Sequence, residues 1–282
     1  MARSQRTVRS RRVLLQIVVA AVVLAVAAAV VLTVSLRPKP SSHPAPGSSP
    51  AAVDVSAAIR SVPASVFDQI GAGTAQTAPT KVDAPALTQG GTPLVLYAGG
   101  EFCPFCAAER WPLAVALSRF GTFSGLGQTS SADAPEVYPD TATLSFHGAS
   151  YASEVLALSA KELSDREHKP LDELTAAEQK VVDGYDAPPY TQQSGTIPFV
   201  DIGGGWLIHG AEYDPAVLKG TTHAQIAQAL TDPSSPIAQA VIGSANVITV
   251  ALCDQTGGQP ASVCTSSGVT TAAAAMAQQK QQ

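Results

Sequence analysis

The chain has 282 residues, of which 45% are hydrophobic and only 14% are charged, with a formal net charge of -5. Five of the 17 basic residues lie in residues 1–12. Residues 37–282 therefore contain the other 12 basic residues and all 22 acidic residues. A nucleic-acid-binding domain is expected to carry a basic patch, and this acidic excess argues against a nucleic-acid partner.

The N-terminal region has the pattern of a membrane anchor. Residues 1–12 contain five arginines and no acid, and Val13 to Leu36 form a 24-residue apolar run with three polar interruptions. A helix of that length crosses a hydrocarbon layer of about 30 Å, and it is longer than the usual core of a cleaved signal peptide, which stays the alternative. Because the positive charges precede the span, the sequence predicts a cytoplasmic N-terminus and a domain outside the cytoplasm.

A proline- and serine-rich linker, residues 37–53, separates this span from the first helices. Proline-rich chains stay extended, so we expect a semi-rigid spacer. Asp54 is a candidate N-cap for a short helix, and Pro63 opens a second helix that Gly71 ends.

The most informative stretch runs from Leu94 to Arg110. The apolar run Leu94 to Tyr97 predicts a buried strand, two glycines follow it, and Cys103-Pro104-Phe105-Cys106 then opens a helix that we expect to continue through Phe120. A helix N-terminus presents unpaired N–H groups and a partial positive charge, which favour a thiolate on Cys103. A redox-active dithiol is the preferred interpretation. Half of a zinc site and a purely structural disulfide are the alternatives.

Residues 150–190 are interpreted as an insertion, of which 160–190 is polar, helical and on the surface. Thr175 to Glu178 has the pattern of a capping box, which predicts a helix that runs to about Gly184. Before it, Thr141 to His147 alternates like a strand, and Tyr151 to Leu158 is either a strand or an early helix.

Two strands joined by three glycines follow, and they predict a hairpin over Thr196 to His209. Pro198 near the start of the first strand is predicted to be a cis-proline, with the backbone of Ile197 free to pair with a ligand. His209 and His147 are interpreted as strand residues with satisfied ring nitrogens rather than as catalytic bases.

The C-terminal part predicts a helix from Thr222 to Leu230 and an apolar helix from Pro236 to about Leu252, which we judge too short and too polar to span a membrane. Cys253 and Cys264 then enclose a loop with two glycines. Outside the cytoplasm an even number of cysteines favours disulfides, so we predict a structural Cys253–Cys264 bridge; a second redox shuttle is the alternative. From Thr265 onward the Ala/Gln/Ser-rich tail is expected to be disordered.

This order of elements resembles the thioredoxin superfamily over residues 85–231. The resemblance implies that Cys103 is the attacking cysteine, Cys106 the resolving cysteine and Pro198 the cis-proline opposite them. The Pro-Phe dipeptide is similar to that of glutaredoxins, and the anchor and insertion are similar to those of exported disulfide oxidoreductases. The region Tyr97 to Phe123, which contains Glu101 to Trp111, also resembles an uncharacterised group of anchored thioredoxin-like proteins.

Two departures from the family pattern shift the expected role. Thioredoxins carry a buried acid six residues before the first cysteine, where this chain has Tyr97. The number of residues between Cys103 and Pro198 is also larger than in thioredoxin itself. Both favour an oxidase or isomerase over a reductase.

The sequence therefore predicts an α/β protein: a thioredoxin-like fold with a helical insertion, preceded by one transmembrane helix. The expected function is that of a membrane-anchored, extracytoplasmic thiol-disulfide oxidoreductase acting on cysteines of exported proteins, with a membrane redox partner as an open addition. The alternative is a non-catalytic binding or assembly domain whose disulfides are structural. No cofactor and no metal are implied. The expected divisions are a basic tail (1–12), a transmembrane helix (13–36), a linker (37–53), a thioredoxin-like domain (54–264, with a C-terminal helical extension over 232–264) and a tail (265–282).

Overall fold

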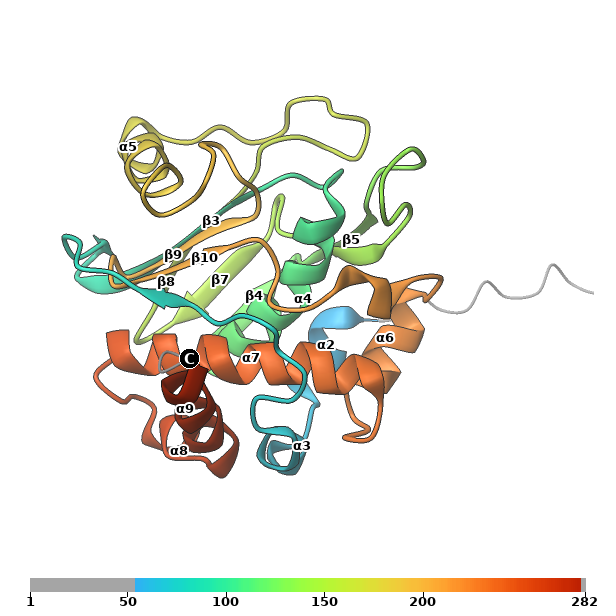
Figure 1. Ribbon diagram of the computed structural model, residues 1–282, viewed down its shortest axis with the longest axis vertical. Coiled ribbons are helices and arrows are strands. Elements are labelled where there is room, and N and C mark those ends of the chain that lie inside the picture. The colour runs from blue at the N-terminus through green and yellow to red at the C-terminus, as the bar shows by residue number, and fades with distance from the viewer. Residues whose placement is uncertain (1–53, 280–282) are drawn as a thin grey trace, which may run out of the picture. The chain divides into compact units, whose positions relative to one another are not determined.

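The computed structural model describes residues 54–279. The expected basic tail, transmembrane helix and linker lie outside the described residues. Within residues 54–279 the protein is a mixed α/β structure, in which helices flank a central mixed sheet (Figure 1).

The central sheet is organised around its third strand. This strand pairs in parallel with β8 and antiparallel with β9, and β9 continues the sheet through β10 to β1, while β2 pairs with the start of β3. The strands are β1 (Thr80–Lys81), β2 (Thr88–Gln89), β3 (Thr92–Gly99), β8 (Ala157–Glu162), β9 (Phe199–Ile202) and β10 (Trp206–His209). The expected buried strand and the expected glycine-linked hairpin are both confirmed.

Alternating side chains of β3 enter different cores, as the period of two in a strand requires. Val95 and Tyr97 belong to the larger core, which contains the two longest central helices. Leu96 and Ala98 belong to a smaller core on the other face. Both faces of the strand are therefore buried, which explains its continuous apolar sequence.

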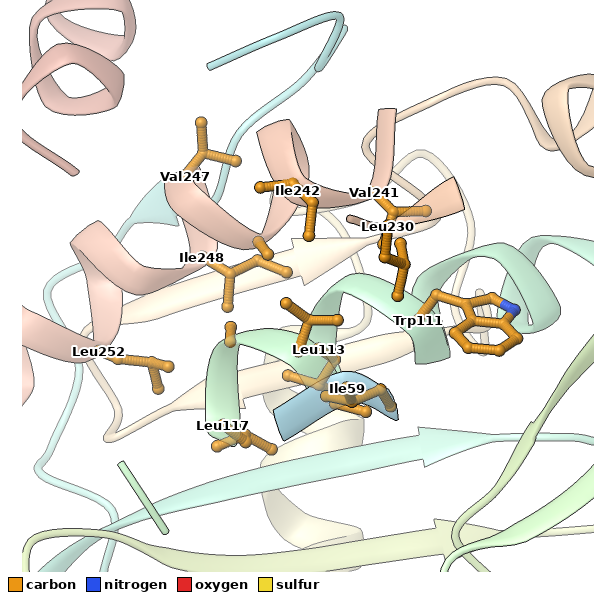
Figure 2. Packing of buried hydrophobic residues seen from close by; sticks show 14 of the residues in the cluster. Ile59, Trp111, Leu113, Leu117, Leu230, Val241, Ile242, Val247, Ile248 and Leu252 are labelled. Carbon is orange, nitrogen blue, oxygen red and sulfur yellow. The ribbon is translucent and has the colours of Figure 1, made fainter. Parts of the chain in front are cut away.

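Helices α4 (Pro104–Leu117) and α7 (Pro236–Gln255) form the larger core. Figure 2 shows Leu113 and Leu117 of α4 together with Ile242, Ile248 and Leu252 of α7 in this cluster. Trp111 recurs with other apolar residues at helical spacing, which predicts a core position rather than a substrate contact. It is fully buried, and its indole N–H donates to the Ala142 carbonyl at 3.1 Å, so this prediction is confirmed.

The length and hydropathy of α7 are sufficient for a membrane span, contrary to our expectation from its sequence. It is a core helix instead, because 72% of its most apolar window is buried inside the protein. The helix is apolar on most sides because other elements cover most of its surface.

Smaller elements surround this framework. The Asp54 carboxylate caps α2 by accepting from the Ala57 N–H at 3.0 Å, and Gly71 ends α3 with a φ of 57°, as the sequence predicts. The expected strand over 141–147 is present as β6, whereas α4 ends at Leu117 and not at Phe120. The remaining bounds are α2 (Val55–Arg60), α3 (Ala64–Ile70), β4 (Gly121–Ser124), β5 (Gly127–Ser130), β6 (Ala142–Ser145), β7 (Ser150–Ser153), a 3₁₀ turn η1 (Pro215–Leu218) and α6 (His223–Ala229).

The expected insertion differs in its first half from the structure. Residues 157–162 are strand β8 of the central sheet, paired along its length with β3. The capping box at Thr175 is confirmed and opens α5 (Ala176–Tyr185), whose Val181 and Val182 pack on the smaller core. Figure 1 shows α5 on the opposite side of the sheet from α7. The helix therefore covers the second face of the sheet.

The expected disordered tail is wrong for residues 265–279. Helix α8 (Ala261–Cys264) is followed by α9 (Ser267–Gln279), which packs on α3 and α7. Val269, Ala272 and Met276 recur at helical spacing and are buried. Low complexity hid an amphipathic helix, because alanine is both a small core residue and the strongest helix former.

Candidate functional site

The Cys103–Cys106 pair lies where β3 passes into α4. Cys103 is the N-cap of α4, Pro104 occupies the first helical turn, and both cysteines are free thiols. The Cys103 Sγ accepts a hydrogen bond from the Cys106 backbone N–H at 3.4 Å. The helix start therefore supplies the donor that the sequence predicts for this sulfur.

The two sulfurs have opposite acidities. A hydrogen bond from the Cys106 side chain, assisted by the backbone N–H groups of Cys106 and Phe105, lowers the Cys103 pKa from 9.0 to about 7 despite partial desolvation. Burial and the hydrogen bond with Cys103 raise the Cys106 pKa well above 9.0. One thiol is thus primed as a nucleophile near neutral pH, while the other holds its proton.

The position of Cys103 at the helix start predicts that it is the only cysteine exposed enough to attack a substrate, but the structure exposes it very little. Its side chain and backbone together are 7% exposed, against 0% for Cys106. Cys103 is therefore the more accessible of the two thiols, as predicted, although both are buried.

Ile197 and Pro198 lie opposite the dithiol. The Ile197–Pro198 peptide bond is cis, as predicted, and the Cys103 Sγ lies 3.8 Å from the Ile197 carbonyl oxygen, within reach of a thiol hydrogen bond. Pro198 is buried and its carbonyl accepts from the Gly210 N–H at 2.9 Å, which ties this corner to the loop after β10. The structure therefore brings together the four residues that the sequence singled out, although Cys103 and Ile197 are 94 positions apart.

A buried ion pair that was not predicted from the sequence begins one helical turn after Cys106, at Arg110. The Arg110 guanidinium donates to both Glu162 carboxylate oxygens at 2.7 Å, and both side chains are fully buried. Arg110 Nη2 also donates to the Gly100 carbonyl at 2.6 Å, and the Cys103 N–H reaches the same oxygen at 3.2 Å. Arg110 thus fixes the turn that carries the cysteines. Its charge helps to lower the pKa of Cys103 and offsets part of the rise in the pKa of Cys106.

Tyr97 lies six residues before Cys103, at the position where the resemblance to thioredoxins implies a buried acid. It is fully buried, its ring meets Phe146 edge-on at 5.1 Å, and its hydroxyl has no hydrogen-bond partner among residues 54–279. Burial raises its pKa well above 10.0. Tyr97 therefore stays protonated at neutral pH and cannot serve as the base that an acid would provide.

A second buried pair, Glu109 and Glu212, lies one helical turn beyond Cys106. Among residues 54–279 no other side chain donates to their carboxyl oxygens, but the two carboxyl groups form a hydrogen bond with each other. Burial is the main cause that raises both pKa values, and for Glu109 the proximity of Glu212 raises it further. Two neighbouring carboxyl groups that are fully buried cannot both lose their protons without a large free-energy cost.

Aromatic side chains lie next to the two cysteines. Phe105, inside the Cys-Pro-Phe-Cys motif, is 42% exposed and meets Tyr138 edge-on at 6.1 Å. The ring of Phe102 contacts the ring of His168 in a tilted arrangement, with the centroids 4.2 Å apart. Phe105 is therefore an exposed apolar side chain between the two cysteines.

The second cysteine pair forms the predicted disulfide. Cys253 and Cys264 are bonded, with their Cα atoms 5.6 Å apart, and the bridge joins the end of α7 to α8. His209, which bonds to the Tyr185 carbonyl at 3.0 Å, has a satisfied ring nitrogen as expected; His147, which pairs with Asp172 at 2.9 Å, does too, but it lies just beyond β6. Within residues 54–279 no cluster of three or more His, Cys, Asp or Glu side chains could hold a metal ion.

One signal for the missed ion pair was present in the sequence. Glu109 and Arg110 interrupt a helix that is otherwise apolar from Ala107 to Leu117. A charged pair in a helix buried on most sides must have internal partners. The partners Glu162 and Glu212 could not be identified from spacing, because the fold alone brings them to α4.

Comparison with known proteins gives a family and nothing more specific. No curated protein and no solved structure matches the chain. Residues 78–254, more than half of the chain, match a family described as a domain of unknown function, DUF929. This stretch contains the dithiol, its buried ion pair and Pro198, and the chain belongs to the DUF929 family.

Proposed function

We propose that this protein is a thiol-disulfide oxidoreductase with a thioredoxin-like domain, anchored in the membrane with the domain outside the cytoplasm. The observation that carries the proposal is the geometry of Cys103: it is the N-cap of α4, its Sγ accepts the Cys106 N–H, and it faces the carbonyl of Ile197 before the cis Pro198. The lowered pKa of Cys103 and the raised pKa of Cys106 agree with this geometry. A structural disulfide has no need of a stabilised thiolate, whereas thiol exchange does.

The strand order supports the thioredoxin-like assignment. A parallel pair, β3 and β8, lies beside an antiparallel pair, β9 and β10, and α4 follows the central strand β3. In this arrangement α5 occupies the place of a regular helix between β8 and β9, so most of the expected insertion becomes part of the fold.

The exchange proceeds in two displacements. The Cys103 thiolate attacks one sulfur of a partner disulfide; that S–S bond breaks, a mixed disulfide forms, and the leaving partner thiolate takes up a proton. Cys106 then loses its proton and attacks the Cys103 sulfur, which releases the second partner thiolate. The partner gains two electrons and the site becomes a Cys103–Cys106 disulfide. The reverse sequence oxidises a partner dithiol.

Arg110 supports both displacements. Its charge is held in place by Glu162 and favours the thiolate form of each cysteine in turn. Tyr97 cannot accept the Cys106 proton, so we expect that proton to leave through water or the departing partner thiolate. The partners are exported proteins whose cysteines react at the site. The exposed ring of Phe105 contacts these proteins.

Trapping tests the proposal directly. Cys106→Ser should accumulate mixed disulfides with exported proteins, visible as bands that a reductant removes, and Cys103→Ser/Cys106→Ser should give none. Protease added to intact, wall-stripped cells should digest the domain if the anchor has the proposed orientation.

The competing function is a non-catalytic binding or assembly domain, which the low exposure of Cys103 favours. It predicts that Cys106→Ser traps nothing and that the dithiol fails to react with glutathione disulfide. Either result alone would count against the oxidoreductase.

A further inference from the structure

A hollow lies away from the dithiol. It is lined by helices α2 and α3, the end of α4, and α8. Its volume is about 310 Å³, which is at the small end of the range for ligand sites. Figure 1 shows α3, α8 and α9 on the same side of α7. The polar groups that line the hollow are all cationic or hydroxyl-bearing: Arg60, Ser118, Arg119, Ser262 and Ser266.

Arg119 is the charged centre of this hollow. Its guanidinium donates to Asn246 Oδ1 at 3.1 Å, to Thr249 Oγ1 at 3.2 Å and to Ser266 Oγ at 3.2 Å, and it stacks on the Phe67 ring at 4.4 Å. All of these partners are neutral. Within residues 54–279 no carboxylate comes within ion-pair distance of Arg119.

The charge of Asp68 raises the Arg119 pKa, but the Asp68 carboxylate already has a hydrogen-bond partner. Asp68 accepts a hydrogen bond from the Gly268 N–H at 2.9 Å, at the start of α9. Burial lowers the Arg119 pKa to about 10, and the charge of Asp68 offsets this only in part. The protein therefore holds a partly desolvated cation whose charge is not matched by a contacting anion, an arrangement that is costly unless something else supplies the anion.

We propose that this hollow binds a small organic anion, a carboxylate or phosphate monoester that carries a short apolar chain. Within the described residues the three acceptors use both N–H groups of Arg119 Nη1 and one of Nη2, which leaves the Nε–H and the second Nη2–H for two oxygens of such a head group. Arg60 and the serine hydroxyls supply further donors. Ile59, Val115 and Val263 form apolar walls for the chain. Arg119 is positioned for this role because three neutral acceptors and an aromatic ring fix its orientation.

The proposal gives the Cys253–Cys264 disulfide a role separate from the dithiol. Ser262 and Val263 belong to α8, which is four residues long and ends at Cys264. So short a helix depends on its tether for a fixed position. Opening the disulfide should therefore weaken anion binding, whereas loss of Cys103 and Cys106 should leave it unchanged.

Calorimetric titration of the full-length protein in a neutral detergent tests this site, with hexanoate, hexyl phosphate, hexanol and inorganic phosphate as probes. Hexanoate or hexyl phosphate should bind saturably at one site, and hexanol and inorganic phosphate at least about tenfold more weakly, since each lacks one half of the recognition. Equal binding of hexanol or of inorganic phosphate, or no saturable binding by any probe, overturns the proposal.

Matched variants separate the site from general charge. Ser262→Asp puts a carboxylate into the hollow at an exposed position and should weaken binding about ten- to a hundredfold. Ala261→Asp adds the same charge at the exposed neighbouring residue outside the lining and should change binding less than about twofold. Arg119→Gln should abolish binding, and if that variant fails to fold the comparison of the two aspartates still decides. Equal affinity of Ser262→Asp and the native chain contradicts the site.

Discussion

The acidity of Cys103 should depend above all on the side chain at position 106. The hydrogen bond from the Cys106 thiol is the largest cause that lowers the Cys103 pKa, ahead of the backbone N–H groups and Arg110. Cys106→Ala removes that donor and leaves the helix N-terminus intact. Cys106→Ser keeps a hydroxyl donor at nearly the same place, so it serves as the matched control.

The size of the effect follows from the total lowering. The Cys103 pKa falls from 9.0 to about 7, and two pKa units correspond to about 3 kcal/mol in favour of the thiolate. Because the Cys106 side chain is the largest contributor, we expect Cys106→Ala to raise the Cys103 pKa by about one unit or more. The thiolate fraction at pH 7 then drops from about one half to roughly a tenth.

The pH dependence of iodoacetamide alkylation at Cys103, followed by mass spectrometry of the reduced full-length protein, measures this shift. Alkylation at pH 7 should slow about fivefold in Cys106→Ala and less in Cys106→Ser. An unchanged or lower pKa in Cys106→Ala would show that the hydrogen bond between the two sulfurs is not what stabilises the thiolate.

Three further outcomes test the surroundings of the site. Arg110→Met leaves the buried Glu162 carboxylate without its partner and should lower the free energy of unfolding by about 3–5 kcal/mol in urea titrations; adding Glu162→Gln should recover most of that loss, and a single-variant loss below about 1 kcal/mol would contradict the role of the pair. The folded-state pKa of Glu109 lies well above its ordinary value of 4.5, mainly because of burial, so folding takes up a proton and stability falls as pH rises above about 4.5. Glu109→Gln should flatten this decline and stabilise the protein at neutral pH, whereas an unchanged slope would mean that the carboxyl group titrates normally. Replacing Cys253 and Cys264 by serine should cost about 2–3 kcal/mol of stability and leave the thiol-exchange rate intact; loss of exchange at full stability would point to a second redox shuttle.

Local patterns account for the parts of the fold that the sequence predicted. The buried strand before the dithiol, the N-cap at Asp54, the capping box at Thr175 and the glycine turn between β9 and β10 each depend on residues close together in the chain. Such signals act within a few positions, so they can be recognised without knowledge of the tertiary structure.

The predictions failed where distant partners decide the structure. Strand β8 has the sequence Ala-Leu-Ser-Ala-Lys-Glu, whose polar residues suggested a surface segment, yet pairing with β3 places it in the sheet. Helix α9 was hidden by its alanine-rich composition, and only contacts with α3 and α7 give its apolar stripe a partner. Glu162 reaches Arg110 across 52 positions, which no spacing rule connects.

The reduction potential of the Cys103–Cys106 pair decides whether this dithiol can exchange with partner disulfides. Equilibration of the full-length protein with glutathione buffers, followed by alkylation and mass spectrometry of each cysteine, gives that potential for both pairs in one experiment. We expect a reversible two-electron couple at Cys103–Cys106, with a reduction potential above roughly −300 mV, the value below which structural disulfides typically lie. The Cys253–Cys264 pair should remain oxidised. A Cys103–Cys106 pair that does not equilibrate, or that lies below that value, would contradict a function in thiol-disulfide exchange.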